Sequence, residues 1–97
     1  MSSLAATLQS FFTDRLVRQR QASPRTVAAY RDTFRLLLGF VQSRTGRASY
    51  TLGLEHLDAS VIVSFLDHLE VDRHNTPRTR NARLAAVRSL FRYAAYR

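Results

Sequence analysis

Cysteine and lysine are absent from this chain of 97 residues, and glycine, with three residues, and proline, with two, are scarce. The absence of cysteine excludes disulfides and thiolate metal sites. So little glycine and proline argues against a disordered or fibrous chain. The sequence has no run of 18 apolar residues, and no basic stretch precedes an apolar core at its N-terminus. We therefore expect a cytoplasmic globular protein with neither a membrane span nor a signal peptide.

Acidic residues are also few, with seven against fifteen basic residues and a net charge of +8. A strongly basic small domain usually binds nucleic acid, and sometimes an acidic membrane or protein. Every basic residue is arginine, whose planar guanidinium suits phosphate and guanine edges, although a GC-rich coding genome is an alternative reason for the missing lysine. The histidines, His56, His68 and His74, lack metal-ligand spacing, so neither a metal nor a cofactor is expected.

Four segments carry apolar residues at helical spacing, and none alternates with a period of two over any length. This pattern predicts an all-α fold, a compact bundle of four helices in a single domain that spans residues 1–97. Start signals precede each segment: Ser2 or Ser3, Ser23-Pro24, Asp58 and Thr76-Pro77. The expected helices cover residues 3–20, 23 to between 43 and 46, 58–71, and 76 to about 96.

The charges are distributed unevenly over these helices. Residues 76–97 hold six arginines and no acid, and residues 23–44 hold four arginines and only Asp32, whereas the third segment is acidic up to Arg73. Such a bundle has a positive and a negative side, which is the footprint expected of a protein that binds a duplex. Arginine also occupies the first turns of the second and fourth helices, where the helix N-terminus favours phosphate. Alternatively, the arginines form a solvated face, some of them paired with acids of the third helix.

Three segments occur in the order and spacing of a known family. Residues 23–31 (SPRTVAAYR) match an S-x-x-T-x-x-x-Y pattern, residues 57–66 match a third helix, and residues 76–94 contain R-L-x-x-V-R-x-L-F-x-Y. Together they resemble the N-terminal core-binding domain of tyrosine recombinases, the phage integrase family, over residues 4–96. The resemblance implies a SAM-like bundle of four helices that covers one face of double-stranded DNA while a separate C-terminal catalytic domain covers the other.

The resemblance also implies that the second and fourth helices approach the major groove. By position, the implied contact residues are Arg25, Thr26, Arg31, Arg78, Thr79, Arg80 and Arg83, with Arg44 and Arg88 at the margin on phosphates. Tyr30 matches a family position, but its place in the apolar stripe favours core packing.

The catalytic residues of that family are missing from this sequence. Its chemistry needs a tyrosine nucleophile, two arginines, a lysine and an H-x-x-R motif, and no histidine here has arginine three residues later. We therefore expect a DNA-binding domain with no catalytic centre, excised from a longer recombinase or encoded by a truncated gene. Its expected partners are duplex DNA and the catalytic domain, and an oligomer on DNA stays open.

Two other functions are compatible with the same residues. A basic helical module that binds an acidic protein partner would use the same arginines. A stand-alone helix-turn-helix regulator is disfavoured, because about six residues including Pro77 join the third and fourth helices, where that motif has three or four.

Overall fold

The computed structural model describes residues 3–96, apart from the side chains at positions 19 and 49. The chain forms α1 (Leu4–Ser10), η1 (Phe11–Gln19), α2 (Pro24–Thr45), η2 (Ser49–Thr51), η3 (Leu54–His56), α3 (Ala59–Val71) and α4 (Pro77–Ala95). Within residues 3–96 the only β-pairing is an isolated bridge between Ser3 and Gly53. The predicted all-α fold with four helices is confirmed, since α1 and η1 together form the first. Ser2 and Arg97 lie outside the described residues.

Each helix starts where the capping signals predict. The side chains of Ser3, Ser23, Asp58 and Thr76 accept hydrogen bonds from the backbone N–H three residues later, at 2.9 to 3.2 Å. Proline follows the cap in α2 and α4, where its missing N–H removes no helical hydrogen bond. α2 ends at Thr45 and is capped by Gly46, whose φ of 71° is a left-handed conformation that glycine adopts without strain.

Removal of these caps is expected to destabilise the protein. Ser23→Ala and Thr76→Ala each leave a backbone N–H at a helix start without its side-chain acceptor, and each should lower the free energy of unfolding by about 0.5–2 kcal/mol. Urea denaturation measures this effect. Ser43→Ala, at an exposed position inside α2, is the matched control and should cause no loss. Equal stability of all three variants would contradict the capping assignment.

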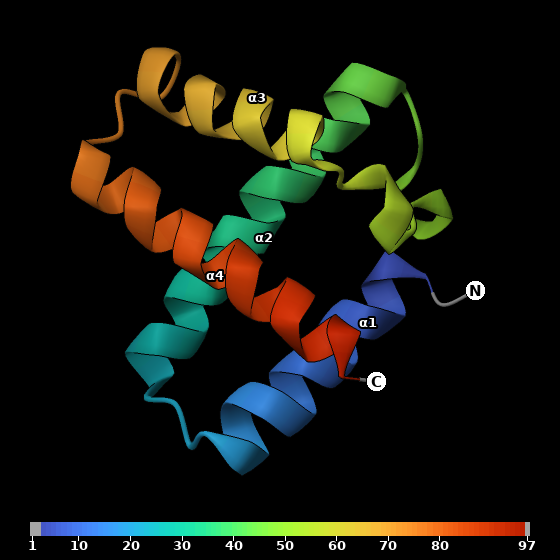
Figure 1. Cartoon of the computed structure of the whole chain (residues 1–97), viewed down its shortest axis with the longest axis vertical. Helices are drawn as coiled ribbons and strands as arrows, with labels where there is room; N and C mark the ends of the chain where they lie inside the picture. The colour runs from blue at the N-terminus through green and yellow to red at the C-terminus, as the bar shows by residue number, and fades with distance from the viewer. Residues whose placement is uncertain (1–2, 97) are drawn as a thin grey trace.

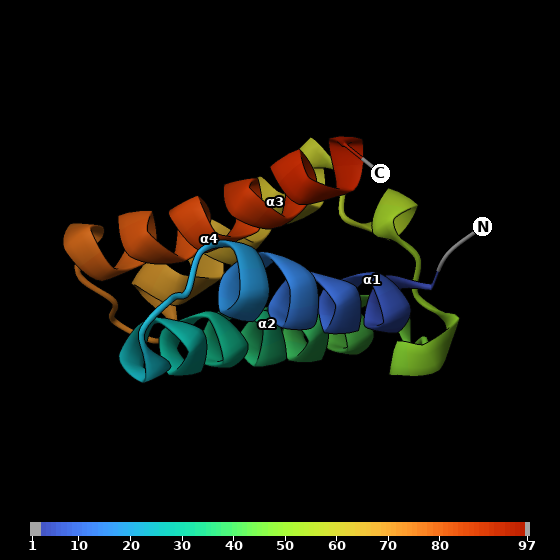
Figure 2. The same cartoon turned by 90° about the horizontal axis from the view of Figure 1, so that it is seen from below.

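The helices pack in two layers. α4 lies across α2, and its C-terminal end lies over the region where α1 passes into η1 (Figure 1). α3 lies against both α2 and α4 (Figures 1 and 2). The molecule measures 35 × 31 × 19 Å, and apolar side chains from every helix fill the space between the layers. The largest fully buried side chains are those of Phe11, Phe65, Leu4, Leu16, Leu37, Leu52, Leu69, Leu90, Val41 and Val87.

An aromatic cluster around Phe11 joins three of the helices. Its ring, which is fully buried, lies 5.5 to 6.2 Å between centroids from the rings of Phe12, Tyr30, Phe34 and Tyr93. Tyr30 stacks nearly parallel to Phe11, so its predicted role in core packing is met. The cluster fixes η1 against α2 and α4, and thereby sets where the end of η1 lies relative to the arginines of α4.

Candidate nucleic-acid interface

The first turns of α2 and α4 are built alike. Ser23 and Thr76 each hold the threonine three residues later, Thr26 and Thr79, through both its backbone N–H and its hydroxyl, with oxygens 3.1 and 3.2 Å apart. These hydroxyls therefore help to order the helix starts.

Between each cap and its threonine stands an exposed arginine, Arg25 in α2 and Arg78 in α4. Within residues 3–96 neither guanidinium forms an ion pair or a side-chain hydrogen bond. A helix start also presents free N–H groups and the positive end of the helix dipole. Each of these two turns therefore offers an uncompensated positive charge beside backbone donors.

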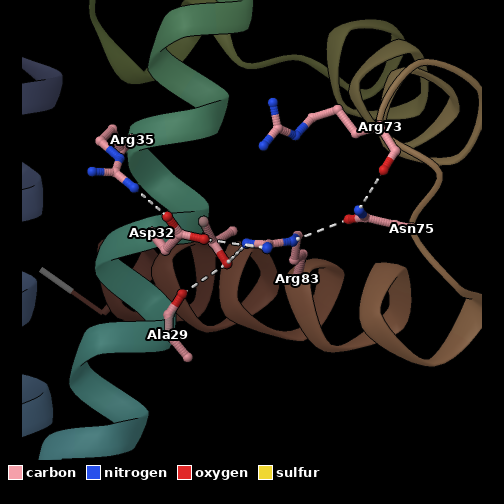
Figure 3. A network of polar contacts seen from close by, with 7 residues as sticks. Ala29, Asp32, Arg35, Arg73, Asn75 and Arg83 are labelled. Atoms are coloured by element: carbon pink, nitrogen blue, oxygen red, sulfur yellow. Dashed lines mark hydrogen bonds and ion pairs between the residues drawn. The ribbon is translucent and has the colours of Figure 1, made fainter.

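Arg83 is placed differently from the other predicted contact residues. Figure 3 shows its side chain reaching from α4 to Asp32 and Asn75. It also donates to the Thr33 hydroxyl, and the three nitrogen–oxygen distances are 3.2 to 3.3 Å. The side chain is only 18% exposed. All three guanidinium nitrogens are thus engaged, and they join α4 to α2 and to the loop between α3 and α4.

Asp32 receives a second arginine from its own helix, Arg35 (Figure 3). The hydrogen bond from Arg35, and with it that from Arg83, holds the pKa of Asp32 below its ordinary value of 3.8, against the opposing effect of partial desolvation. The carboxylate is 39% exposed, so solvent screens these pairs. Asp32 is therefore ionised at neutral pH and neutralises part of the local positive charge.

The lowered pKa of Asp32 predicts a pH-dependent contribution to stability. A carboxyl with a depressed folded-state pKa stabilises the fold above its unfolded-state pKa, here about 3.8, and this contribution is lost as the pH falls through the folded-state pKa. Asp32→Asn should therefore lower the free energy of unfolding by up to about 1 kcal/mol at pH 7, and the difference should vanish in strong acid. Urea denaturation from pH 7 to 2 measures it, with Asp67→Asn as control. A difference that grows in acid would contradict the assignment.

Arg80 is partly neutralised by the third helix. Its Nη1 lies 2.6 Å from Glu70 Oε1, with the two side chains 34% and 36% exposed. Its Nη2 donates to Asn81 Oδ1 at 3.0 Å. This is the pairing with an acid of the third helix that the sequence left open, and it occurs beside the start of α4.

Arg31 and Arg44 lie apart from the turns that hold Arg25 and Arg78. Arg31 is exposed and stands about 200° around α2 from Thr33, the residue that α4 contacts, so it faces away from α4. Arg44 is near the far end of α2, about 28 Å along the axis from Arg25, with its guanidinium 5.4 Å from the Phe40 ring centroid. The structure thus does not gather all the predicted residues on one surface.

The middle of α4 adds a further row of positive charge. Arg88 and Arg92 are exposed, stand one turn apart on the same face, and have no ion pair within the described chain. Arg20, which follows η1, donates to Ser89 Oγ on α4 at 3.5 Å and lines a surface pocket together with Arg88 and Arg92. Because Arg92 follows Arg88 by four residues, the sequence of the fourth helix predicts that the two lie on one face. Nothing in the sequence signals Arg20, because its position depends on how η1 packs.

Two of the histidines that the sequence analysis considered as metal ligands form local contacts instead. His56 Nδ1 accepts a hydrogen bond from the backbone of Gly53 at 2.8 Å, and His68 Nδ1 lies 2.8 Å from Asp72 Oδ2. Across residues 3–96 no three histidine or acidic side chains are grouped to hold a metal ion. In the same part of the chain, every helix is too short or too polar to cross a bilayer.

Comparison with known proteins gives two kinds of match. Residues 8–97 fit the family described as phage integrase, N-terminal SAM-like domain. In Sinorhizobium fredii (strain NBRC 101917 / NGR234), "Putative integrase/recombinase y4rC" is 52% identical over 95 residues, which are 98% of this chain and 29% of that protein. "Putative integrase/recombinase y4rD" is 50% identical over 92 residues, 95% of this chain and 33% of that protein. The chain therefore spans about a third of the length of these curated relatives. No solved structure gives a significant match.

Proposed function

The chain belongs to the phage integrase family, as one of its N-terminal SAM-like domains, and on that premise we propose that it is the DNA-binding domain of a site-specific tyrosine recombinase or integrase. In this proposal the 97 residues are one domain that clamps one face of duplex DNA. The chemistry of strand exchange belongs to a catalytic domain that covers the other face.

The observation that carries the proposal is the pair of matching first turns in α2 and α4. Arg25 and Arg78 are exposed, free of carboxylates within residues 3–96, and set beside helix N-termini that favour phosphate. Neither turn contains an acid, although acids stabilise helix starts by about 0.3–1 kcal/mol at exposed sites. A bound phosphate would supply the missing negative charge at both turns.

The other predicted contact residues have graded roles in this proposal. Thr26 and Thr79 order the two turns, and Arg88 extends the phosphate contacts along α4. Arg83 acts as a positioning residue, since its contacts with Asp32 and Thr33 hold α4 on α2. Arg80, paired with Glu70, contributes less charge than Arg78. Arg31 and Arg44, which lie apart from the two turns, add only long-range positive charge.

The test is a binding titration with the whole chain. Fluorescence anisotropy with a labelled 30-base-pair duplex at about 50 mM salt should show saturable binding, and its affinity should fall linearly on a log–log plot as salt rises. Poly-glutamate, titrated in the same way, represents an acidic protein partner. Failure to bind the duplex would overturn the proposal. Tighter binding of poly-glutamate than of DNA would also overturn it, in favour of an acidic protein partner.

A further inference from the structure

A pocket of about 380 Å³ lies between the end of η1, the first half of α2 and the side of α4 that faces them. Three arginines line it: Arg20, Arg88 and Arg92. No acidic side chain is among the residues that line it, so its charge is not neutralised within the pocket. A concave site with one sign of charge focuses the electrostatic field and attracts a counter-ion.

The two arginines of α4 repel each other at this spacing. Arg88 and Arg92 are one turn apart on the same helix face, and like charges four residues apart destabilise a helix. Arg20 is brought to the same place by its hydrogen bond to Ser89, which is itself buried. An anion between these guanidinium groups would relieve the repulsion and accept hydrogen bonds from more than one of them.

The rest of the pocket wall is partly apolar and can contact a group larger than a simple anion. Tyr30, Leu84 and Ala85 add apolar surface beside the arginines. The ring of Tyr30 is held in place, since it stacks on the buried Phe11 with centroids 6.2 Å apart. A phosphodiester in a DNA strand carries a deoxyribose on each side, whose carbon faces pack on such a surface. Inorganic phosphate has no group to place there.

We propose that this pocket binds one backbone phosphodiester of duplex DNA. Arg88 and Arg92 donate hydrogen bonds to the same phosphate, Arg20 closes the site from η1, and Tyr30 packs on the adjacent deoxyribose. The inference rests on the proposed function and deepens it, because it assigns DNA contacts to Arg20, Arg92 and Tyr30 and extends the interface from helix ends to the middle of α4.

The sharing of one phosphate gives a quantitative test. The double variant Arg88→Ala/Arg92→Ala should make the log–log salt slope of duplex binding shallower by about 0.9, the value for one phosphate contact. A change of about 1.8 would indicate two separate phosphates, and no change would indicate none, and either result would overturn the shared site. The control Arg18→Ala/Arg47→Ala removes the same charge outside the pocket. Circular dichroism confirms that each variant is folded.

A second experiment separates DNA from a free anion. Neutral methylphosphonate groups are placed one at a time along the duplex, and one position should weaken binding of the wild type but not that of the double variant. Inorganic phosphate titrated without DNA should shift the NMR signals of the Arg88 and Arg92 side chains without saturation. Saturable binding of inorganic phosphate would overturn the assignment to DNA. A methylphosphonate that weakens both proteins equally would also overturn it.

The outcomes also separate this inference from the proposed function. If the double variant binds like the wild type while Arg25→Ala/Arg78→Ala binds more weakly, the pocket is not a contact and the DNA-binding function stands. If the wild type does not bind the duplex, both fail.

Discussion

Arg25→Ala combined with Arg78→Ala is expected to weaken duplex binding about a hundredfold at about 50 mM salt, and to make the salt slope shallower by about 1.8. Each phosphate contact releases about 0.9 counter-ion, which at that salt concentration favours binding by about tenfold. Both side chains are exposed and have no carboxylate partner within residues 3–96, so their charge is available to DNA. Fluorescence anisotropy over a series of salt concentrations measures both quantities.

A charge-matched control is essential to this prediction, because any loss of positive charge weakens binding to DNA. Arg18→Ala/Arg47→Ala also removes two charges. Arg18 pairs with Asp14 on η1, and Arg47 follows the C-terminal end of α2, about 33 Å along the helix from its start. The control should lose far less affinity than the test variant. Equal losses would show that DNA responds only to net charge and would contradict a defined surface.

Phe11→Ala is expected to lower the free energy of unfolding by about 3–5 kcal/mol. The Phe11 ring is fully buried and packs on four other aromatic rings, so its removal leaves a cavity where η1, α2 and α4 meet. Since small domains have only about 5–15 kcal/mol of stability, the variant should be partly unfolded near physiological temperature. Urea and thermal denaturation followed by circular dichroism measure the loss.

The control for Phe11→Ala is Val17→Ala in the same helix. Val17 is 55% exposed, so its truncation should change the stability by no more than about 0.5 kcal/mol. If Phe11→Ala were as stable as Val17→Ala, the aromatic cluster would not be what joins the first helix to the bundle. The geometry of the pocket, which depends on that junction, would then lose its support.

The helix starts could be predicted from the sequence because capping is a local property. Ser23-Pro24, Asp58 and Thr76-Pro77 fix their helices through hydrogen bonds that span three residues. The π-helix η1 could not be predicted, since apolar spacing does not distinguish it from an α-helix of the same length. The backbone hydrogen bond from Leu4 N–H to Leu52 O joins the long loop to α1. It depends on tertiary packing, so no local sequence pattern predicts it.

The candidate site was predicted less completely than the fold. The excess of arginine on α2 and α4 can be read from the sequence. Whether each arginine is free to bind DNA depends on acidic residues far away in the sequence that pair with it. Asp32 and Arg83 are 51 residues apart in sequence, and only the crossing of α2 and α4 brings them together. The family resemblance predicts Arg31 as a contact by its position in the second helix, whereas the direction of its side chain relative to α4 depends on which face of α2 packs against α4. Sequence therefore identified the basic helices but not which arginines are free.

The most direct test of the DNA-binding surface is an NMR titration of the isotope-labelled chain with a short duplex. We predict that the largest changes in backbone amide shifts fall on residues 25–26, 78–79 and 88–92, while α3 from residue 59 to 69 changes little. Changes centred on α3, or spread evenly over all helices, would contradict the account.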